Sequence, residues 1–513
     1  MKRIRRIGPL AMIGAGLVLA ASATSGQRPT GPPAPPLPAY PSEEYLLLGN
    51  ATRGAGEPMI AVDPTDPRHM IVVAMGNLQQ LHGKPATQGS TNLYHLVPRS
   101  TINWLAVTHD GGITWEIGEQ PILSGRFTRC PDAFAEVTKD GVFIAGCEPR
   151  ETESGPDFFG MSAVQVSTDK GRTWGPVVEM ISDYGLSRFA PHLKPISGAF
   201  PPGDPNRVAT HSPWDRPFLH IDDSSGVIYG VAQGGSTAID TPPGQRRPQA
   251  YVTASTDGGK SFGTVYSWDS PDYPQLSRGL GATAAHGMLA VLYIARAVPP
   301  AENAACPCPV LGISRDLGRT FAYRVLRNVA IAPAASGQPP FPGGATGGLA
   351  DIAADPTTPG RLALLRYERG RYTVAVSEDE GRTWSSFVTA GSVPDATSLT
   401  KPAFEYSRSG VLGLIWRASY ADRSYDVWAA ISRDGGRTFS RSVRVSHARS
   451  PAYDKYRNAG LFGDDIQDLA MDAQNLHVVW GDSRAGFQGV WYGRVALADF
   501  AFEGTASAHD ARR

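Results

Sequence analysis

An eight-residue motif that occurs six times constrains the fold of this chain more than any other feature. It reads Ser/Thr-x-Asp-x-Gly-x-Thr/Ser-Trp/Phe, and its copies span 108–115, 167–174, 255–262, 314–321, 377–384 and 432–439. Successive copies begin 59, 88, 59, 63 and 55 residues apart. Self-similarity at such a period indicates a repeat architecture in which each repeat is one supersecondary unit.

The motif itself predicts a hairpin turn. An apolar, β-prone run precedes most copies, as at 104–107 and 427–431, and a second strand-like run often follows. The Asp can accept hydrogen bonds from backbone N–H groups of its own turn, and the Gly can adopt positive φ. The terminal Trp or Phe is expected to pack the turn against the sheet.

This motif resembles the Asp-box, also called the BNR repeat, of the sialidase superfamily and related β-propellers. The resemblance implies an all-β fold of four-stranded blades, with each box joining the third and fourth strands of a blade, away from the active site. The box aspartates are therefore expected to be structural. They are Asp110, Asp169, Asp257, Asp316, Asp379 and Asp434.

Related strands that begin the blades set the predicted blade count. They lie at 57–63, 132–137, 215–222, 349–355, 401–406 and 465–472. The last unit has no box and supplies only three strands, so its fourth strand is expected to come from the N-terminal run 44–48. This predicts a seven-bladed propeller closed by an N-terminal strand. Six blades, the usual number in sialidases, is the alternative.

The two ends of the chain are predicted to lie outside the propeller. A basic segment, an apolar run over 7–21 and an Ala-Ser-Ala pattern at 21–23 indicate a secretory signal peptide over 1–23, with an uncleaved anchor as the alternative. A Pro-rich tether follows over 24–41, then the propeller over 42–500 and a flexible tail over 501–513. The expected location is secreted or periplasmic, with no membrane span after cleavage.

Charge and cysteine content limit the classes of partner. The formal net charge is zero, so nothing favours nucleic acid. Export would allow disulfides, and we expect Cys130–Cys147 because two adjacent strands would bring these residues together. Cys306 and Cys308 could close only a small ring, which leaves their bonded and reduced states open. No motif indicates a metal or another cofactor.

Candidate functional residues lie where the innermost strands begin, because propellers commonly bind ligands at one mouth of their central channel. The predicted catalytic or binding residues are Arg53, Glu57, Asp132, Asp215, Arg216, Tyr456 and Asp465. A wider polar set adds Arg278, Asp351, Lys401 and Asp464, and His211 and His220 could also face the mouth. Each of these residues also fits an ordinary turn or cap.

The resemblance to sialidases extends to function in outline. That family holds a substrate carboxylate with three arginines and uses a Tyr activated by a Glu as nucleophile, with an Asp as acid/base. The family's first arginine precedes Ile-Pro, whereas the corresponding strand start here reads Gly54-Ala-Gly-Glu57-Pro58, with Arg53 out of register. Tyr456 is the late tyrosine of this chain.

Two functions therefore remain open from the sequence. The first is a secreted propeller that acts on or binds glycans, with an exo-α-sialidase-like glycoside hydrolase as its enzymatic form. The alternative is a non-catalytic propeller that binds a protein or serves as an assembly factor. The expected partner is accordingly a glycan or glycoprotein at the mouth, or a protein, and the expected state is a monomer.

Overall fold

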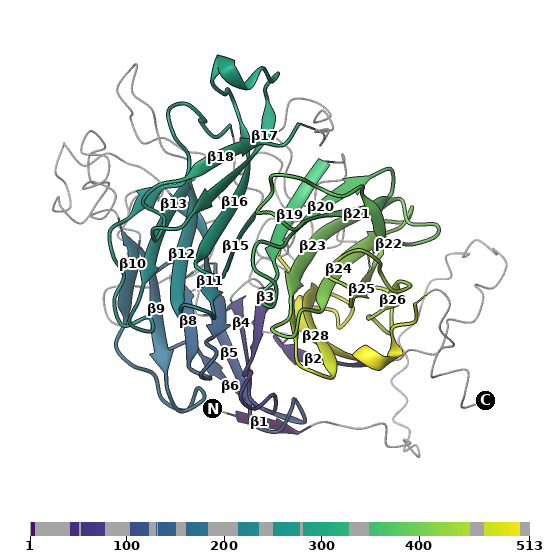
Figure 1. The fold of residues 1–513 in the computed structure, drawn as a ribbon. Coiled ribbons are helices and arrows are strands. Elements are labelled where there is room, and N and C mark those ends of the chain that lie inside the picture. The colour runs from purple at the N-terminus through teal and green to yellow at the C-terminus, as the bar shows by residue number, and fades with distance from the viewer. Residues whose placement is uncertain are drawn as a thin grey trace, which may run out of the picture.

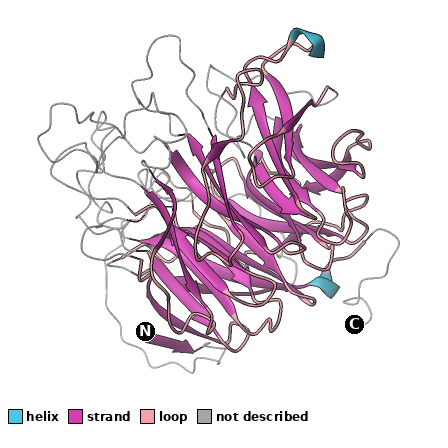
Figure 2. Cartoon of the chain, turned by 60° about the vertical axis from the view of Figure 1, so that its left-hand side comes forward, coloured by secondary structure: helices cyan, strands magenta, loops and turns pink. Residues whose placement is uncertain are grey.

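The computed structural model describes residues 2–5, 42–50, 53–76, 103–122, 130, 132–149, 161–182, 214–234, 250–276, 281–327, 348–451 and 466–502. These residues form strands almost throughout, with two single-turn 3₁₀ helices, η3 (Pro300–Glu302) and η7 (Leu497–Asp499) (Figures 1 and 2). Among them no helix has the length and apolar character needed to cross a bilayer. The predicted tether, most of the predicted signal peptide and residues 503–513 of the tail lie outside the described residues.

The strands form seven antiparallel sheets, which we number as blades 1 to 7 in the order of their innermost strands. Blades 1 to 3 consist, from the innermost strand outward, of β3 (Ala55–Val62), β4 (Met70–Gly76), β5 (Trp104–Thr108) and β6 (Thr114–Glu119); β7 (Phe134–Val137), β8 (Phe143–Cys147), β9 (Met161–Ser167) and β10 (Val178–Ser182); and β11 (Trp214–Asp222), β12 (Val227–Gly234), β13 (Ala250–Ser255) and β14 (Tyr266–Ser267).

Blades 4 to 6 repeat this order. They consist of β15 (Gly281–Ala285), β16 (Met288–Ala295), β17 (Cys308–Ser314) and β18 (Ala322–Val325); β19 (Gly348–Ala354), β20 (Leu362–Glu368), β21 (Arg371–Ser377) and β22 (Val388–Ser392); and β23 (Ser398–Tyr406), β24 (Leu412–Ser419), β25 (Tyr425–Ser432) and β26 (Val443–Arg444).

Blade 7 combines three strands from the C-terminal part of the chain with one strand from its N-terminal part. It contains β27 (Asp468–Met471), β28 (Asn475–Asp482) and β29 (Gly489–Ala496), and β2 (Ser42–Leu48) pairs antiparallel with β29 at its outer edge. In blade 1 a fifth strand, β1 (Lys2–Arg5), pairs with β6, although these residues fall within the predicted signal peptide.

The seven innermost strands form a closed ring. β3 contacts β7, β7 contacts β11, and the contacts continue through β15, β19 and β23 to β27, which contacts β3 again. Figure 1 shows β3, β11, β15, β19 and β23 meeting around the centre. The predicted seven-bladed all-β propeller is therefore confirmed. The strand 281–285 was not among the six strands predicted to begin blades, because His286 stands where four other innermost strands end at an aspartate.

The hydrophobic core is divided among the contacts between consecutive blades. One cluster joins Leu365 and Val374 of blade 5 to Leu412 and Leu414 of blade 6, and comparable clusters occupy the other six contacts between blades. The second strand of a blade is buried on both faces; β16 is buried at every position. Each blade therefore depends on both neighbours, and the ring is held together by contacts that are distant in sequence.

The six motif copies lie at the turns between the third and fourth strands of blades 1 to 6. In blade 2, Asp169 Oδ1 accepts a hydrogen bond from Thr173 N at 2.8 Å, and Asp169 Oδ2 accepts one from Thr173 Oγ1 at 2.6 Å. Ser167 Oγ donates to Asp169 and accepts from Gly171 N. Burial alone would raise the pKa of Asp169, but these hydrogen bonds outweigh it and lower the pKa to about 2.

The same turns also contact the preceding blade, which the sequence did not reveal. The box aromatics join the hydrophobic clusters between their own blade and the one before it, as Trp384 of blade 5 does with blade 4. Gly318 has φ +79°, and a Cβ there would lie 2.8 Å from a methyl of Val252 in blade 3. The motif therefore fixes both the hairpin and the packing between neighbouring blades.

A candidate active site in the central channel

The central channel contains a cavity of about 370 Å³ lined by residues of all seven innermost strands. This volume is within the usual range for small-ligand sites. Its polar lining includes four carboxyl groups from four blades, a histidine, a lysine and an arginine: Glu136, His220, Asp351, Lys401, Glu405, Arg408 and Asp468.

Strand register arranges these carboxyl groups in two layers. Asp351 and Asp468 lie four residues before the turn residues Asp355 and Asp472. In the other layer, Glu136, His220 and Glu405 lie two residues before Thr138, Asp222 and Ser407, which begin the corresponding turns of their blades. Residues two apart share a face of a strand, about 7 Å apart along it. The Asp351 layer is therefore the one nearer the strand starts, where the mouth lies.

Burial raises the pKa of every one of these carboxyl groups, because the surrounding strands enclose them while leaving part of each surface open to the channel. The pKa of Glu136 and that of Asp351 rise to about 8. The pKa of Asp468 rises to about 7, although backbone N–H groups of Ile60 and Leu469 favour its charged form.

The pKa of Glu405 is raised well above its ordinary value, and its position explains why. Burial is the largest cause of the raised pKa, and the negative charges of Asp468, Glu136 and Asp351 add to it, against an opposing contribution from Arg408. Glu405 belongs to blade 6, between Asp351 in blade 5 and Asp468 in blade 7. Three consecutive blades thus bring three interacting carboxyl groups to one side of the channel.

His220 supplies a neutral base to the same channel. Burial lowers the pKa of its imidazole to about 4, so the ring is uncharged near neutral pH. The cavity therefore combines protonated carboxylic acids, a carboxyl group that ionises near pH 7 and a neutral imidazole.

Arg408 crosses the channel at the end opposite the mouth. It lies in the turn after β23 of blade 6, and its guanidinium forms a two-point ion pair with Asp223 in the turn after β11 of blade 3. Its Nη2 also donates to the carbonyl oxygen of Val137 in blade 2 at 2.6 Å. Blade 6 is thereby tied to blades 2 and 3 across the ring.

Three residues near the mouth have a left-handed backbone. Glu57, Asp132 and Lys401 have φ values of 48°, 51° and 52°, and each lies six residues before the turn residue of its blade. Register shifts interrupt β3 and β23 at the first and third of these positions. Such bulges re-aim side chains and are frequent beside active sites. Of the three residues, Lys401 lines the cavity.

Of the seven predicted site residues, Arg53, Glu57 and Asp132 have described side chains. Arg53 pairs with Glu119 (Nη1–Oε1, 2.7 Å) and lies over the ring of Trp104, and it does not line the cavity. Glu57 is buried and Asp132 half-buried. Asp215 and Arg216 belong to β11, but their side chains lie outside the described part of the structure. So do Tyr456 and Asp465, and with them Arg278, Asp464 and His211.

Three of the further residues named from the sequence line the cavity. Asp351, Lys401 and His220 line the cavity, whereas Glu136, Glu405, Asp468 and Arg408 were not singled out. The signal available for Glu136, His220 and Glu405 was their shared spacing from the end of the innermost strand. Across the described ranges, no group of three His, Cys, Asp or Glu side chains is arranged to hold a metal ion.

Comparisons with known proteins give similarity in fold alone. No protein-family model and no curated protein matches the chain. A protein of unknown function from Dyadobacter fermentans is 13% identical, with a TM-score of 0.44 over 88% of this chain and 97% of its own. The α-L-arabinofuranosidase Arb93A of Fusarium graminearum is 13% identical (TM-score 0.38; 72% and 93% covered), and the Trypanosoma rangeli sialidase is 14% identical (0.39; 74% and 55%).

Because these TM-scores lie below 0.5, no residue role is transferred from those proteins to this chain. The class follows instead from the molecule itself: seven radial sheets, six of four strands and one with β1 as an added fifth, with the box motif at the turn between the third and fourth strands of six blades. This is a sialidase-like β-propeller fold.

Proposed function

We propose that this chain is a glycan-acting propeller: a glycoside hydrolase that takes a sugar at the channel mouth and uses carboxyl groups of the channel for acid–base chemistry. The observation that supports it is the meeting, in one cavity, of carboxyl groups whose pKa values are raised to about 7 and 8. Most glycosidases need one protonated carboxylic acid and one carboxylate on either side of the scissile bond.

The roles are assigned from the direction of the pKa shifts and from position in the channel. Glu405, whose pKa is raised well above its ordinary value by burial and by the neighbouring carboxyl groups, is the proposed general acid. Asp468, with a pKa of about 7, supplies the carboxylate, and Ile60 N steadies its charged form through a hydrogen bond of 2.9 Å. Asp351 in blade 5 has a pKa of about 8 and is protonated at neutral pH. Asp468 therefore carries the single negative charge proposed for that side of the channel.

The cations of the described lining favour an uncharged glycan over a sialoside. The described lining has two cationic side chains, Lys401 and Arg408, and Arg408 is already paired with Asp223. A sialic acid carboxylate would meet no free cluster of arginines among these lining residues. The proposal is therefore for a neutral sugar at the mouth.

A panel of fluorogenic glycosides tests this function on the purified chain between pH 4 and 9. We expect turnover of a neutral glycoside and none of a sialoside, with kcat reduced about 10²–10⁴-fold in Glu405→Gln and Asp468→Asn. The matched control is Asp257→Asn, a box variant remote from the channel, which should keep its kcat. Turnover of the sialoside would overturn the proposed substrate.

Failure to cleave any substrate would overturn the enzymatic role. A glycan array then separates the remaining possibilities: retained binding that Glu405→Gln weakens would make the chain a glycan-binding propeller, and loss of all binding would favour the protein-binding alternative. We also propose an extracytoplasmic location, supported by the basic and apolar N-terminal pattern and by two disulfides. Fractionation of cells expressing the full chain tests this location.

A further inference from the structure

The two disulfides of the chain differ in what they can do for the fold. Cys130 and Cys147 are 17 residues apart, and both are fully buried against Ile122 and Ala163. Cys306 and Cys308 are bonded across a single intervening residue. A cross-link stabilises mainly by restricting the unfolded chain, and this restriction is smallest for the shortest loop. The second bond therefore has little to contribute as a structural staple.

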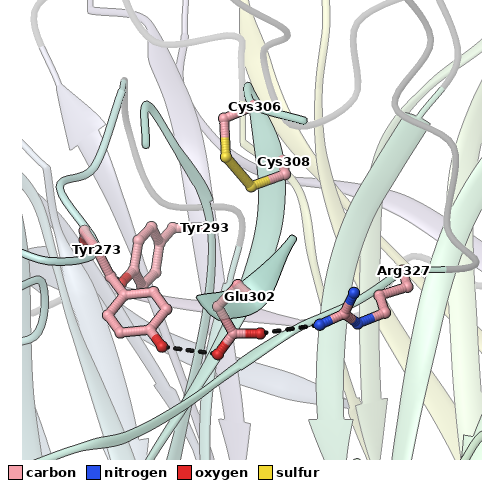
Figure 3. The surroundings of a disulfide bond; sticks show 6 residues. All are labelled: Tyr273, Tyr293, Glu302, Cys306, Cys308 and Arg327. Atoms are coloured by element: carbon pink, nitrogen blue, oxygen red, sulfur yellow. Dashed lines mark hydrogen bonds and ion pairs between the residues drawn. A yellow bond between two sulfur atoms is a disulfide. The ribbon is translucent and has the colours of Figure 1, made fainter. Parts of the chain in front are cut away.

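The second bond is also more accessible. Cys306 is half-buried and Pro307 is exposed, whereas Cys308 is buried as the first residue of β17. Figure 3 shows the pair at the end of the connection between β16 and β17, which spans residues 296–307. β16 runs antiparallel to β15 and so ends on the face where β15 begins. The pair thus lies on the same face as the channel mouth.

Several contacts hold this connection, beginning with a hydrogen bond from Arg296 N to the carbonyl oxygen of Pro274 at 2.8 Å. Near its middle, Glu302 in η3 accepts a hydrogen bond from Tyr273 Oη at 2.9 Å and pairs with Arg327 at 3.2 Å (Figure 3). Tyr273 in turn stacks on Tyr323 of β18, with ring centroids 4.6 Å apart. At its end, the disulfide fixes residues 306–308. Opening the disulfide would remove one restraint and leave the propeller sheets and the Glu302 contacts in place.

We infer that Cys306–Cys308 is a thiol–disulfide exchange site, open to a dithiol reductant, that controls the order of the 296–307 connection on the face of the channel mouth. A thiolate of the dithiol attacks Cys306 Sγ, which forms a mixed disulfide and releases Cys308 as a thiolate that takes up a proton. The second thiolate of the reductant then attacks the reductant sulfur that is bonded to Cys306 Sγ. Cys306 leaves as a thiolate and is protonated. Two electrons pass to the protein, and the reductant becomes a disulfide.

Differential alkylation of the native full chain tests this site. The protein is incubated with dithiothreitol without denaturant, alkylated with iodoacetamide and mapped by mass spectrometry. We expect Cys306 and Cys308 to be labelled at least about ten-fold faster than Cys130 and Cys147, which need global unfolding for access. Labelling of both pairs at one rate, labelling of neither, or labelling of Cys306 and Cys308 without reductant would each overturn the inference.

Hydrogen exchange tests the consequence for the connection. Reduction should speed amide exchange in 296–307 and leave β8 and β16 unchanged, and the Cys306→Ser/Cys308→Ser variant should show the same pattern without reductant. The matched variant Cys130→Ser/Cys147→Ser should instead speed exchange around 130–147 and lower the unfolding midpoint. Unchanged exchange in 296–307 after confirmed reduction would overturn the proposed control of this connection.

Discussion

Arg408 and Asp223 form an ion pair across the central channel, although 185 residues separate them in the sequence. Arg408 Nη2 lies 3.2 Å from Asp223 Oδ1, and the Nε group bonds the other carboxylate oxygen. The pair joins turns on opposite sides of the ring, so it can form only when the propeller is closed. Sheet hydrogen bonds within a blade give no such link.

This pair should show energetic coupling in a double-mutant cycle. We expect Arg408→Ala and Asp223→Ala to share a coupling free energy of about 1 kcal/mol in urea unfolding, because the contact is two-pointed while both groups keep some solvent access. Arg68 and Asp66, which pair at 2.5 Å within one exposed turn, provide the control cycle and should show no measurable coupling. Equal coupling in the two cycles would contradict a role for the cross-channel pair in closure.

The channel carboxyl groups should make the fold less stable as the pH rises. Their folded pKa values of about 7 and 8 exceed the unfolded values near 4, so their contribution to stability is fully present below about pH 4 and is lost as the pH rises through 7 and 8. Urea midpoints measured from pH 5 to 9 should fall, and Asp351→Asn and Glu405→Gln should flatten that fall. An unchanged slope in both variants would refute the assignment.

The box aspartates should make the fold less stable as the pH falls. Hydrogen bonds from Ser261, opposed by burial, lower the pKa of Asp257 to about 2, and the pKa of Asp379 is also about 2. Groups with lowered folded pKa values stabilise above the unfolded value, and this stability is lost as the pH falls from about 4 through 2. Melting temperatures should therefore peak at about pH 4–5, between the acid loss of the box contribution and the loss of the channel contribution as the pH rises. Asp257→Asn should be less sensitive to acid than the parent chain, and an identical acid transition would count against this explanation.

Two reasons for glycine in the box can be tested separately: the close contact with the preceding blade and the positive φ of the backbone. Gly318 and Gly370 have similar φ values, +79° and +81°, but a Cβ at Gly318 would meet both methyls of buried Val252, whereas Gly370 has open space around it. Gly370→Ala should cost about 1 kcal/mol from the left-handed backbone alone. Gly318→Ala should cost about 1–3 kcal/mol more, because Val is stiff and cannot move aside. Equal costs in urea unfolding would show that the turn alone matters.

Local features of the sequence predicted the repeat well, but they did not indicate most of the charged residues that line the cavity. The box turns depend on residues within eight positions, so Asp169 and Thr173 were recognisable before any fold was known. Glu136 and Glu405 are ordinary polar residues of short strands until seven strands from distant parts of the chain form a ring around them. Arg408 illustrates the same limit, since nothing near it in sequence indicates Asp223. The sequence favoured the starts of the innermost strands because they are rich in charge. Glu136 and Glu405, whose pKa values are raised, lie farther along their strands, two residues before the turns.

Closure of blade 7 should depend on Arg484 more than on its neighbours at the surface. Arg484 Nη2 lies 2.7 Å from Glu44 Oε1 in β2 and 2.6 Å from Asp482 Oδ2, and the Arg484 and Glu44 side chains are only 11% and 4% exposed. Arg494 makes an exposed pair with the adjacent Glu43, at 2.6 Å, with side chains 24% and 49% exposed. Arg484→Met should cost about 3–5 kcal/mol because it leaves buried carboxylates without their cation. Arg494→Met should cost about 0–1 kcal/mol. Urea unfolding of the two variants measures both values, and similar losses would mean that β2 is held by its backbone pairing with β29 and not by this buried cation.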